Sequence, residues 1–167
     1  MGSCADCSKD VEPGSNIMEN LLADGRRTVD PFIQSLNMEI LWSSPEEAEG
    51  VMYVDKKVLN PYGTVHGGCM MTLADSVAGH NVIAAGRMCV TLNSTVNFLR
   101  PADCKAVYCH SKIQKLGRQI SVVAVEQTDE RGNLLMTGIL TFNTVKNVPP
   151  HIIAPRENFN ELRLLED

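Results

Sequence analysis

Apolar residues recur along the chain at two different spacings, and the change between them divides the chain into elements. From residue 70 to residue 83 they recur every three or four positions, which is typical of a helix with one buried side. Before and after this segment they alternate with polar residues, which is typical of half-buried strands. The pattern therefore predicts one long helix between two groups of strands.

Two short elements precede the long helix. Asp30-Pro31 fits the N-cap and first position of a short helix whose apolar side contains Phe32, Ile33 and Leu36. Strands are expected at Met38–Trp42 and Gly50–Val54, and the Ser-Ser-Pro-Glu-Glu run between them predicts a hairpin turn. Residues 55–66 then form a loop that leads into the helix.

The segment after the helix is strand-like throughout. Its first strand alternates cleanly, so Val90, Leu92, Val96 and Phe98 are expected on one face and Thr91 on the opposite, polar face. Turn residues at Gly117-Arg118 and at 129–133 separate the later strands. The expected strands are 90–99, 106–116, 120–127 and 134–145.

These elements predict an α+β fold. One long apolar helix followed by consecutive antiparallel strands fits the hot-dog arrangement, in which a curved antiparallel sheet of about six strands wraps a central helix. Small residues on the helix (Ala74, Ala78 and Gly79 among them) suit a close approach to the sheet or to a copy of itself. The predicted domain spans 30–147, with a tail and a helix at 1–29 and a second tail at 148–167.

Composition narrows the functional classes. The chain has 167 residues, of which 44% are hydrophobic and 21% charged, which are ordinary globular values. Its net charge of −5 argues against nucleic acid as a partner. No apolar run reaches about 18 residues, so no membrane span is expected. The first residues have no apolar core of a secretory signal, which predicts a cytoplasmic protein.

The six cysteines predict neither a disulfide framework nor a metal site. Cys4 and Cys7 form a CxxC pair, but no second pair completes a zinc site. The other cysteines lie in apolar or strand-like runs and are interpreted as small buried hydrophobic residues.

The candidate chemistry lies where the loop meets the helix. Gly67 and Gly68 stand at the expected helix start, where backbone N–H groups have no intrahelical partner and the helix dipole is positive. These groups suit a developing oxyanion, and glycine lets a substrate carbonyl approach the backbone closely. Asn60 and His66 are polar residues of the same loop. This arrangement predicts an active site.

Asp75 is a lone carboxylate on an otherwise apolar helix, and burying an unpaired carboxylate is costly. It follows Gly67 by eight residues, so it lies about 12 Å along the same helix. If both groups act on one substrate atom, Asp75 must come from another subunit of a two-fold dimer. There it can serve as a general base or as a nucleophile, and Thr91 can hold the water or the carboxylate.

Each of these residues also has a structural interpretation. His66 can serve only to orient its loop, and Asn60-Pro61 can be a plain turn initiator. Gly67 and Gly68 can serve packing alone, and Asp75 can be a structural residue of the helix. The functional interpretation rests on the set as a whole.

The set resembles a known family. Asn60-x-x-Gly63-x-x-His66-Gly67-Gly68 with Thr72-Leu-Ala-Asp75-Ser76 is similar to the hot-dog acyl-CoA thioesterases of the phenylacetic-acid-degradation (PaaI-like) branch. The likeness extends to Asn97–Ala102 and to Leu116-Gly117-Arg118, so it covers roughly residues 30–147. It implies that Gly67 N–H polarises the thioester carbonyl and that Asp75 of the partner subunit is the catalytic carboxylate. Asn60 and His66 would position the thioester and the attacking water, with Thr91 assisting.

The resemblance also implies the binding partners. Basic residues near the strand ends would bind the phosphates of coenzyme A. The alternative interpretation of each of these residues is a solvated surface charge. Relatives usually form tetramers of two dimers and need no metal or other cofactor. The candidate residues for the coenzyme A site are Arg100, Lys105, Lys115, Arg118 and Gly68.

The leading hypothesis is therefore an acyl-CoA thioesterase that releases a free acid and coenzyme A. The alternatives are a hot-dog dehydratase or hydratase acting on acyl thioesters, and a non-catalytic acyl-CoA binder. The expected pocket walls are the partner subunit, Met70, Met71, Met88 and the helix at Phe32–Leu36. Methionine-lined pockets adapt to many shapes, so the sequence predicts no particular acyl group.

Overall fold

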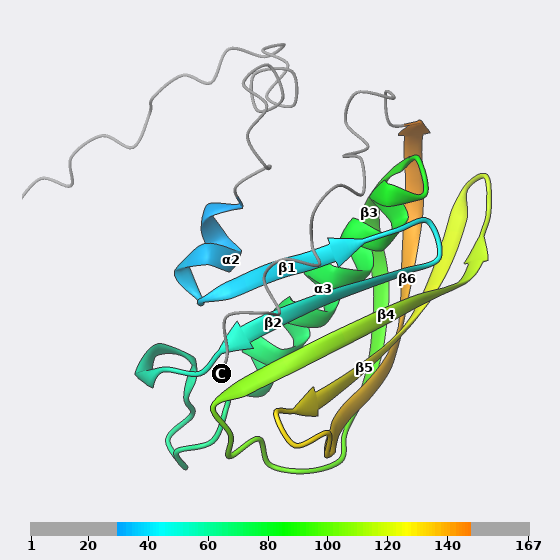
Figure 1. Ribbon diagram of the computed structural model, residues 1–167. Coiled ribbons are helices and arrows are strands. Elements are labelled where there is room, and N and C mark those ends of the chain that lie inside the picture. Colours follow the sequence, from blue (N-terminus) through cyan, green and yellow to red (C-terminus); the bar gives the residue numbers. More distant parts are fainter. Residues whose placement is uncertain (1–29, 148–167) are drawn as a thin grey trace, which may run out of the picture.

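A single curved sheet and one long helix make up the part of the chain that the computed structural model describes, residues 30–147. All neighbouring strands are antiparallel, and their order is β1-β2-β4-β5-β6-β3. The helix α3 (Gly67–Ala84) lies along one face of the sheet (Figure 1). This is the α+β hot-dog fold that the pattern predicts. The strands are β1 (Met38–Ser43), β2 (Glu47–Tyr53), β3 (Arg87–Phe98), β4 (Ala106–Leu116), β5 (Ile120–Asp129) and β6 (Leu134–Asn147).

The helix expected within residues 1–29 lies outside the described residues, as do the tail at 148–167 and the pair Cys4 and Cys7. The division of the chain into a domain and two tails stays a prediction. Among the residues that the structure describes, no helix is both long and apolar enough to cross a membrane.

The central helix follows the predicted periodicity. Its buried residues recur at the expected spacing, so the core lies between this face and the sheet. The helix ends at Ala84, and Gly86 follows with a φ of +80°, a left-handed conformation that glycine adopts without steric cost. The buried helix residues are Met70, Leu73, Ala74, Val77, Ala78, Asn81 and Val82.

Close contact between helix and sheet depends on a glycine in β2. A Cβ atom on Gly50 would lie 2.6 Å from Val77 Cγ2 and 2.9 Å from the carbonyl oxygen of Glu39. Only a residue without a side chain therefore allows β2 to pass this near the helix.

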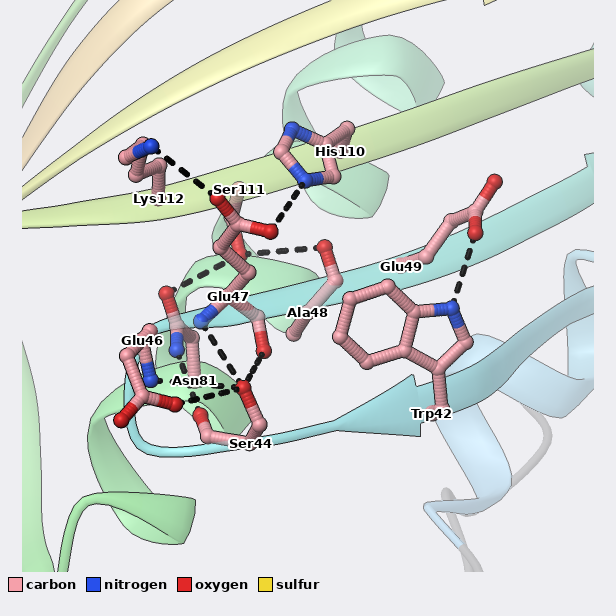
Figure 2. A network of polar contacts seen from close by, with 10 residues as sticks. All are labelled: Trp42, Ser44, Glu46, Glu47, Ala48, Glu49, Asn81, His110, Ser111 and Lys112. Carbon is pink, nitrogen blue, oxygen red and sulfur yellow. Dashed lines mark hydrogen bonds and ion pairs between the residues drawn. The ribbon is translucent and has the colours of Figure 1, made fainter. Parts of the chain in front are cut away.

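The last turns of α3 are tied to the β1–β2 hairpin by a buried polar network (Figure 2). Asn81 is fully buried, and its Nδ2 donates to the carbonyl oxygen of Ser44 at 2.8 Å. Its Oδ1 accepts from Ser111 Oγ at 3.3 Å. On the outer face of the sheet, Lys112 and His110 of β4 lie 3.1 and 3.6 Å from the carboxylate of Glu47 in β2.

The short helix α2 (Pro31–Ser35) begins as predicted. The Asp30 carboxylate accepts hydrogen bonds from the backbone N–H groups of Phe32 and Ile33, and Pro31 occupies the first helical position. The expected apolar side is only partly buried, because Ile33 packs into the core whereas Phe32 is 61% exposed.

The face assignment within β3 is wrong in its first half, and a β-bulge explains the error. The β3–β6 register shifts between Thr91 and Asn93, so Leu92 has no partner in β6. A bulge inserts one residue and changes which side chains point to each face. Thr91 pairs with the buried Phe142, whereas Leu92 is 56% exposed.

After the bulge the alternation resumes in the opposite phase. Ser94 pairs with the buried Leu140, and Phe98 pairs with the buried Met136. Thr91, Ser94 and Val96 consequently share the face of β3 that is directed toward α3.

Candidate functional site

The loop before α3 is built around the Asn60 side chain. Its Oδ1 accepts from the backbone N–H groups of Tyr62 (2.9 Å) and Thr64 (3.2 Å), and its Nδ2 donates to Thr64 Oγ1 at 2.9 Å. Gly63 closes the turn with a φ of +82°. Asn60 thus has the structural role of a turn initiator, and it also lies in the depression described below.

His66 is the N-cap of α3. Its Nδ1 accepts the N–H of Gly68 at 2.9 Å, which satisfies one of the free donors of the helix start. A neutral imidazole that accepts at Nδ1 carries its proton on Nε2. The first-turn amides are therefore not equivalent, because Gly68 N–H is already bound within the chain while Gly67 N–H has no intrahelical acceptor. The expected use of Gly68 in binding coenzyme A competes with this cap.

Gly67 lines a surface depression together with Asn60, Phe98 and Arg100. The Phe98 ring packs against Gly67, since a Cβ atom there would be 3.2 Å from Phe98 Cζ. We call Asn60, His66, Gly67 and this depression the glycine site. It combines one free amide at the positive end of a helix with an aromatic wall.

Asp75 lies near the middle of α3, on the side that the sheet leaves partly open. Its Oδ1 accepts the Thr91 hydroxyl at 2.7 Å, so strand β3 holds the carboxylate in place. Asp75 is half-buried, not fully buried as a lone carboxylate in an apolar helix suggests. Of the two uses predicted for Thr91, to hold the water or the carboxylate, the structure shows the contact with the carboxylate.

A second depression surrounds Asp75. Its polar lining includes Thr91 and Ser94, and its apolar lining includes Phe32 of α2 and Met71 of α3. We call Asp75, Thr91 and this depression the aspartate site. It shares no lining residue with the glycine site. The two groups that the sequence proposes for one reaction thus lie in separate depressions of one chain.

The four predicted cations divide between the two ends of the sheet. Arg100 lines the glycine site and donates to the carbonyl oxygen of Leu134 at 3.2 Å. Lys105 does not line this depression and directly precedes β4. Lys115 and Arg118 lie at the other end of β4, which at 11 residues spans about 35 Å. Within one chain the four do not form a single phosphate-binding cluster.

The described cysteines are free thiols held in their neutral form. Burial, and to a smaller extent the nearby negative charge of Asp75, raises the pKa of Cys89 to about 11. Burial, with the acidic residues Glu130, Asp129 and Asp103, also raises the pKa of Cys104 to about 11. Within residues 30–147 no group of three or more His, Cys, Asp or Glu side chains is arranged to hold a metal ion.

Sequence reasoning missed Phe98 and Ser94 as site residues. Phe98 was expected among the apolar residues of β3, but nothing in the sequence pairs it with a glycine 31 positions earlier. Ser94 has the same phase as Val96 and Phe98, and the bulge brings Thr91 onto this face, so the two hydroxyls share the aspartate site. The expected wall residues are divided between the depressions: Met70 lines the glycine site, whereas Met71 and Phe32 line the aspartate site. Met88 lines neither of them.

Comparison with known proteins matches residues 62–136 to the family described as thioesterase superfamily. The 1,4-dihydroxy-2-naphthoyl-CoA hydrolase of Escherichia coli (strain K12) is 33% identical over 96 residues, which cover 56% of this chain and 71% of that protein.

Solved structures share the fold. A protein of Streptococcus mutans, bound to acetyl CoA in its crystal structure, is 25% identical with a TM-score of 0.65, covering 68% of this chain and 92% of that chain. The PaaI protein of the E. coli phenylacetic acid degradation operon is 21% identical with a TM-score of 0.67, covering 71% of this chain and 87% of that chain.

Proposed function

The chain belongs to the thioesterase superfamily and is a thioester hydrolase, and we propose that it hydrolyses an acyl-CoA thioester to a free acid and coenzyme A. The observation that carries the proposal is the Asp75 carboxylate, held at 2.7 Å by Thr91 in an open depression. Hydrolysis of a thioester uses a general base or a nucleophile, either of which a positioned carboxylate can be, and a donor for the developing oxyanion.

The glycine site supplies the donor. We assign Gly67 N–H to the thioester carbonyl oxygen, because it is a first-turn amide without an intrahelical partner. As the carbonyl carbon becomes tetrahedral, negative charge grows on this oxygen at the positive end of the helix dipole. Asn60 Nδ2 uses only one of its hydrogens on Thr64, so the other can reach the substrate. His66 Nε2–H can do the same, because only its Nδ1 is used by the cap.

The aspartate site supplies the carboxylate. As a general base, Asp75 takes a proton from water while the water oxygen attacks the carbonyl carbon; the C–S bond then breaks and the thiolate takes up a proton. As a nucleophile, Asp75 attacks the carbon itself, expels the thiolate and forms a mixed anhydride that water hydrolyses. Label from heavy-oxygen water in the Asp75 side chain would show the second route, because it can enter there only when water attacks the Asp75 carbonyl of the anhydride.

We infer that the complete site forms between two subunits. Gly67 and Asp75 are eight residues, about 12 Å, apart on one helix, too far to act on the same carbon. Strand β3 is an edge strand with exposed apolar residues, including Val90 at 52% and Leu92 at 56%. A long edge of this kind favours pairing with another chain. A dimer formed there would place both aspartate sites near its centre, and the homotetramer remains a prediction.

Coenzyme A as the thiol carrier is supported by two observations. The E. coli relative is a CoA-thioester hydrolase by name, and the S. mutans structure holds acetyl CoA. In this chain Arg100 lies in the same depression as Gly67, where a guanidinium can meet a phosphate. We therefore assign Arg100 to the carrier, and Lys105, at the start of β4, as a second candidate. Lys115 and Arg118 can contribute only from the partner subunit.

A thiol-release assay over a panel of short, medium-chain and aromatic acyl-CoAs tests the proposal. Asp75→Asn keeps the shape of the side chain and removes its charge, so kcat should fall about 10²- to 10⁴-fold. Glu126→Gln is the matched control, because it removes an exposed carboxylate of β5 outside both depressions and should leave kcat unchanged. Equal rates for Asp75→Asn and the parent would contradict the assignment.

The same assay separates the two alternative functions. A dehydratase or hydratase would change the enoyl absorbance without releasing thiol. A non-catalytic binder would bind acyl-CoA and release none over hours.

A further inference from the structure

Two fully buried side-chain amides connect α3 to the sheet, one at each end of the helix. Near the C-terminal end, Asn81 donates to the carbonyl oxygen of Ser44 at 2.8 Å (Figure 2). Near the N-terminal end, Gln127 of β5 donates through Nε2 to the carbonyl oxygen of Met70, also at 2.8 Å. Both amides are 0% exposed. The Asn81 bond is distant from Gly67, whereas the Gln127 bond lies one turn from it.

The Gln127 bond reaches the first turn of α3. Met70 donates its own N–H to the His66 carbonyl at 3.2 Å, so it is part of the turn that contains Gly67. Met70 and Gly67 also line the same depression. A helix start has few internal hydrogen bonds and opens more easily than the helix centre. A bond from the sheet to this turn therefore restricts the direction of Gly67 N–H.

Gln127 is costly to bury. Its Oε1 accepts no hydrogen bond from the described residues, and an unpaired buried acceptor opposes folding. The neighbouring Cys109 thiol supplies no charge, because burial raises its pKa to about 12 against a smaller opposing effect of the Gln127 amide. An apolar side chain of similar size would avoid the cost. The Nε2 bond to Met70 is the contact that such a side chain would lose.

We propose that Gln127 is a positioning residue that fixes the first turn of α3, and so the direction of Gly67 N–H. It touches neither depression and acts only through Met70. The inference rests on the proposed function for its effect on hydrolysis. Its effect on the helix start is independent of any activity.

The test compares Gln127→Met with Asn81→Leu. Each substitution replaces a buried amide with an apolar side chain of similar size, so it loses one hydrogen bond between the helix and its surroundings but also removes the cost of burying an amide. The melting temperature of either variant should therefore differ from that of the parent by no more than about 5 °C. Gln127→Met should lower kcat about 10-fold with KM within a factor of two, because transition-state stabilisation at Gly67 is lost. Asn81→Leu should leave kcat within a factor of two.

Amide hydrogen exchange gives a readout without substrate. In Gln127→Met, exchange at Cys69 and Met70 should accelerate several-fold, because their N–H groups bond to the His66 carbonyl within the loosened turn. In Asn81→Leu the faster exchange should instead fall on Ala85, whose N–H bonds to the Asn81 carbonyl. Unchanged exchange at Cys69 and Met70, with unchanged kcat, would overturn the inference.

Failure of the inference is distinguishable from failure of the proposed function. If the parent releases no thiol from any acyl-CoA, the function fails and the exchange measurement alone decides the role of Gln127. If Gln127→Met does not fold, Gln127→Glu replaces it. A buried carboxyl stays protonated at low pH and can still donate to Met70, so kcat relative to the parent should fall as pH rises. A flat ratio would contradict the inference.

Discussion

The glycine site and the aspartate site differ in how much of their surroundings the chain itself supplies. Around Gly67, the Asn60 side chain makes three hydrogen bonds within its loop and His66 caps the helix. The loop is further tied to the body by Val65 N–H, which donates to the Ala102 carbonyl at 3.0 Å. The glycine site is therefore held in place by contacts within one subunit.

Around Asp75 the chain supplies much less. Among residues 30–147 one hydrogen bond, from Thr91, holds the carboxylate, and Thr91 belongs to an edge strand. The depression there is bordered by Phe32, an apolar side chain that is 61% exposed. The contrast indicates that the donor is preorganised within the subunit, whereas the surroundings of the carboxylate are to be completed at an interface.

On the glycine side of this contrast, the largest effect is expected at Gly67. Gly67→Pro removes the proposed donor while fitting the helix, because proline is favoured at the first helical position and His66 already has an extended conformation (φ −65°, ψ 131°). We expect kcat to fall roughly 10²- to 10³-fold. Gly67→Ala is the control, because it keeps the N–H and adds the same Cβ contact with Phe98. Equal losses of kcat in the two variants would show that the added Cβ contact with Phe98, and not the missing N–H donor, is responsible.

A mixing experiment tests whether the two sites act across subunits. Asp75→Asn and Gly67→Pro should each be nearly inactive alone. When their subunits are mixed and allowed to exchange, half of the dimers should be hybrids, and each hybrid contains one intact pair of sites. Thiol release should then recover to about a quarter of the parent rate. No recovery in a mixture shown by mass spectrometry to contain hybrids would place both groups in one subunit.

The sequence predicts most of the fold because its signals are local. The helix periodicity, the Asp30 cap and the turn at 129–133 each depend on residues within a few positions of one another. The bulge at Leu92 has no such signal, since neither a glycine nor a break in the alternation marks it. Thr91 was therefore placed on the wrong face, although its contact with Asp75 was expected.

The sequence predicts which residues form the candidate site, but not the hydrogen bonds that they make. Asn60, His66 and Gly67 were identified as a group, yet the sequence does not show that the His66 ring would bind Gly68 N–H. Gln127 was missed because its partner is 57 positions away. A signal was present, because Gln127 is in phase with the buried Val123 and Val125. A polar side chain at an inward position of a strand requires a buried partner.

The smallest expected effect concerns the charge of the aspartate site. The pKa of Cys89 is raised to about 11, chiefly by burial and then by the Asp75 charge. Asp75→Asn should lower this pKa toward its usual value and increase the thiolate fraction at pH 9. Alkylation by iodoacetamide, followed by peptide mass spectrometry, should then be roughly two- to five-fold faster at Cys89.

Cys104 provides the internal control for this measurement. Its pKa is also raised to about 11, but by burial and by Glu130, Asp129 and Asp103 near the glycine site. Its alkylation rate should be the same in Asp75→Asn and in the parent. Equal acceleration at both cysteines would indicate general loosening of the fold. Faster alkylation confined to Cys89 would confirm that the Asp75 charge acts locally. A carboxylate that is available to a substrate in its own depression is expected to act in this way.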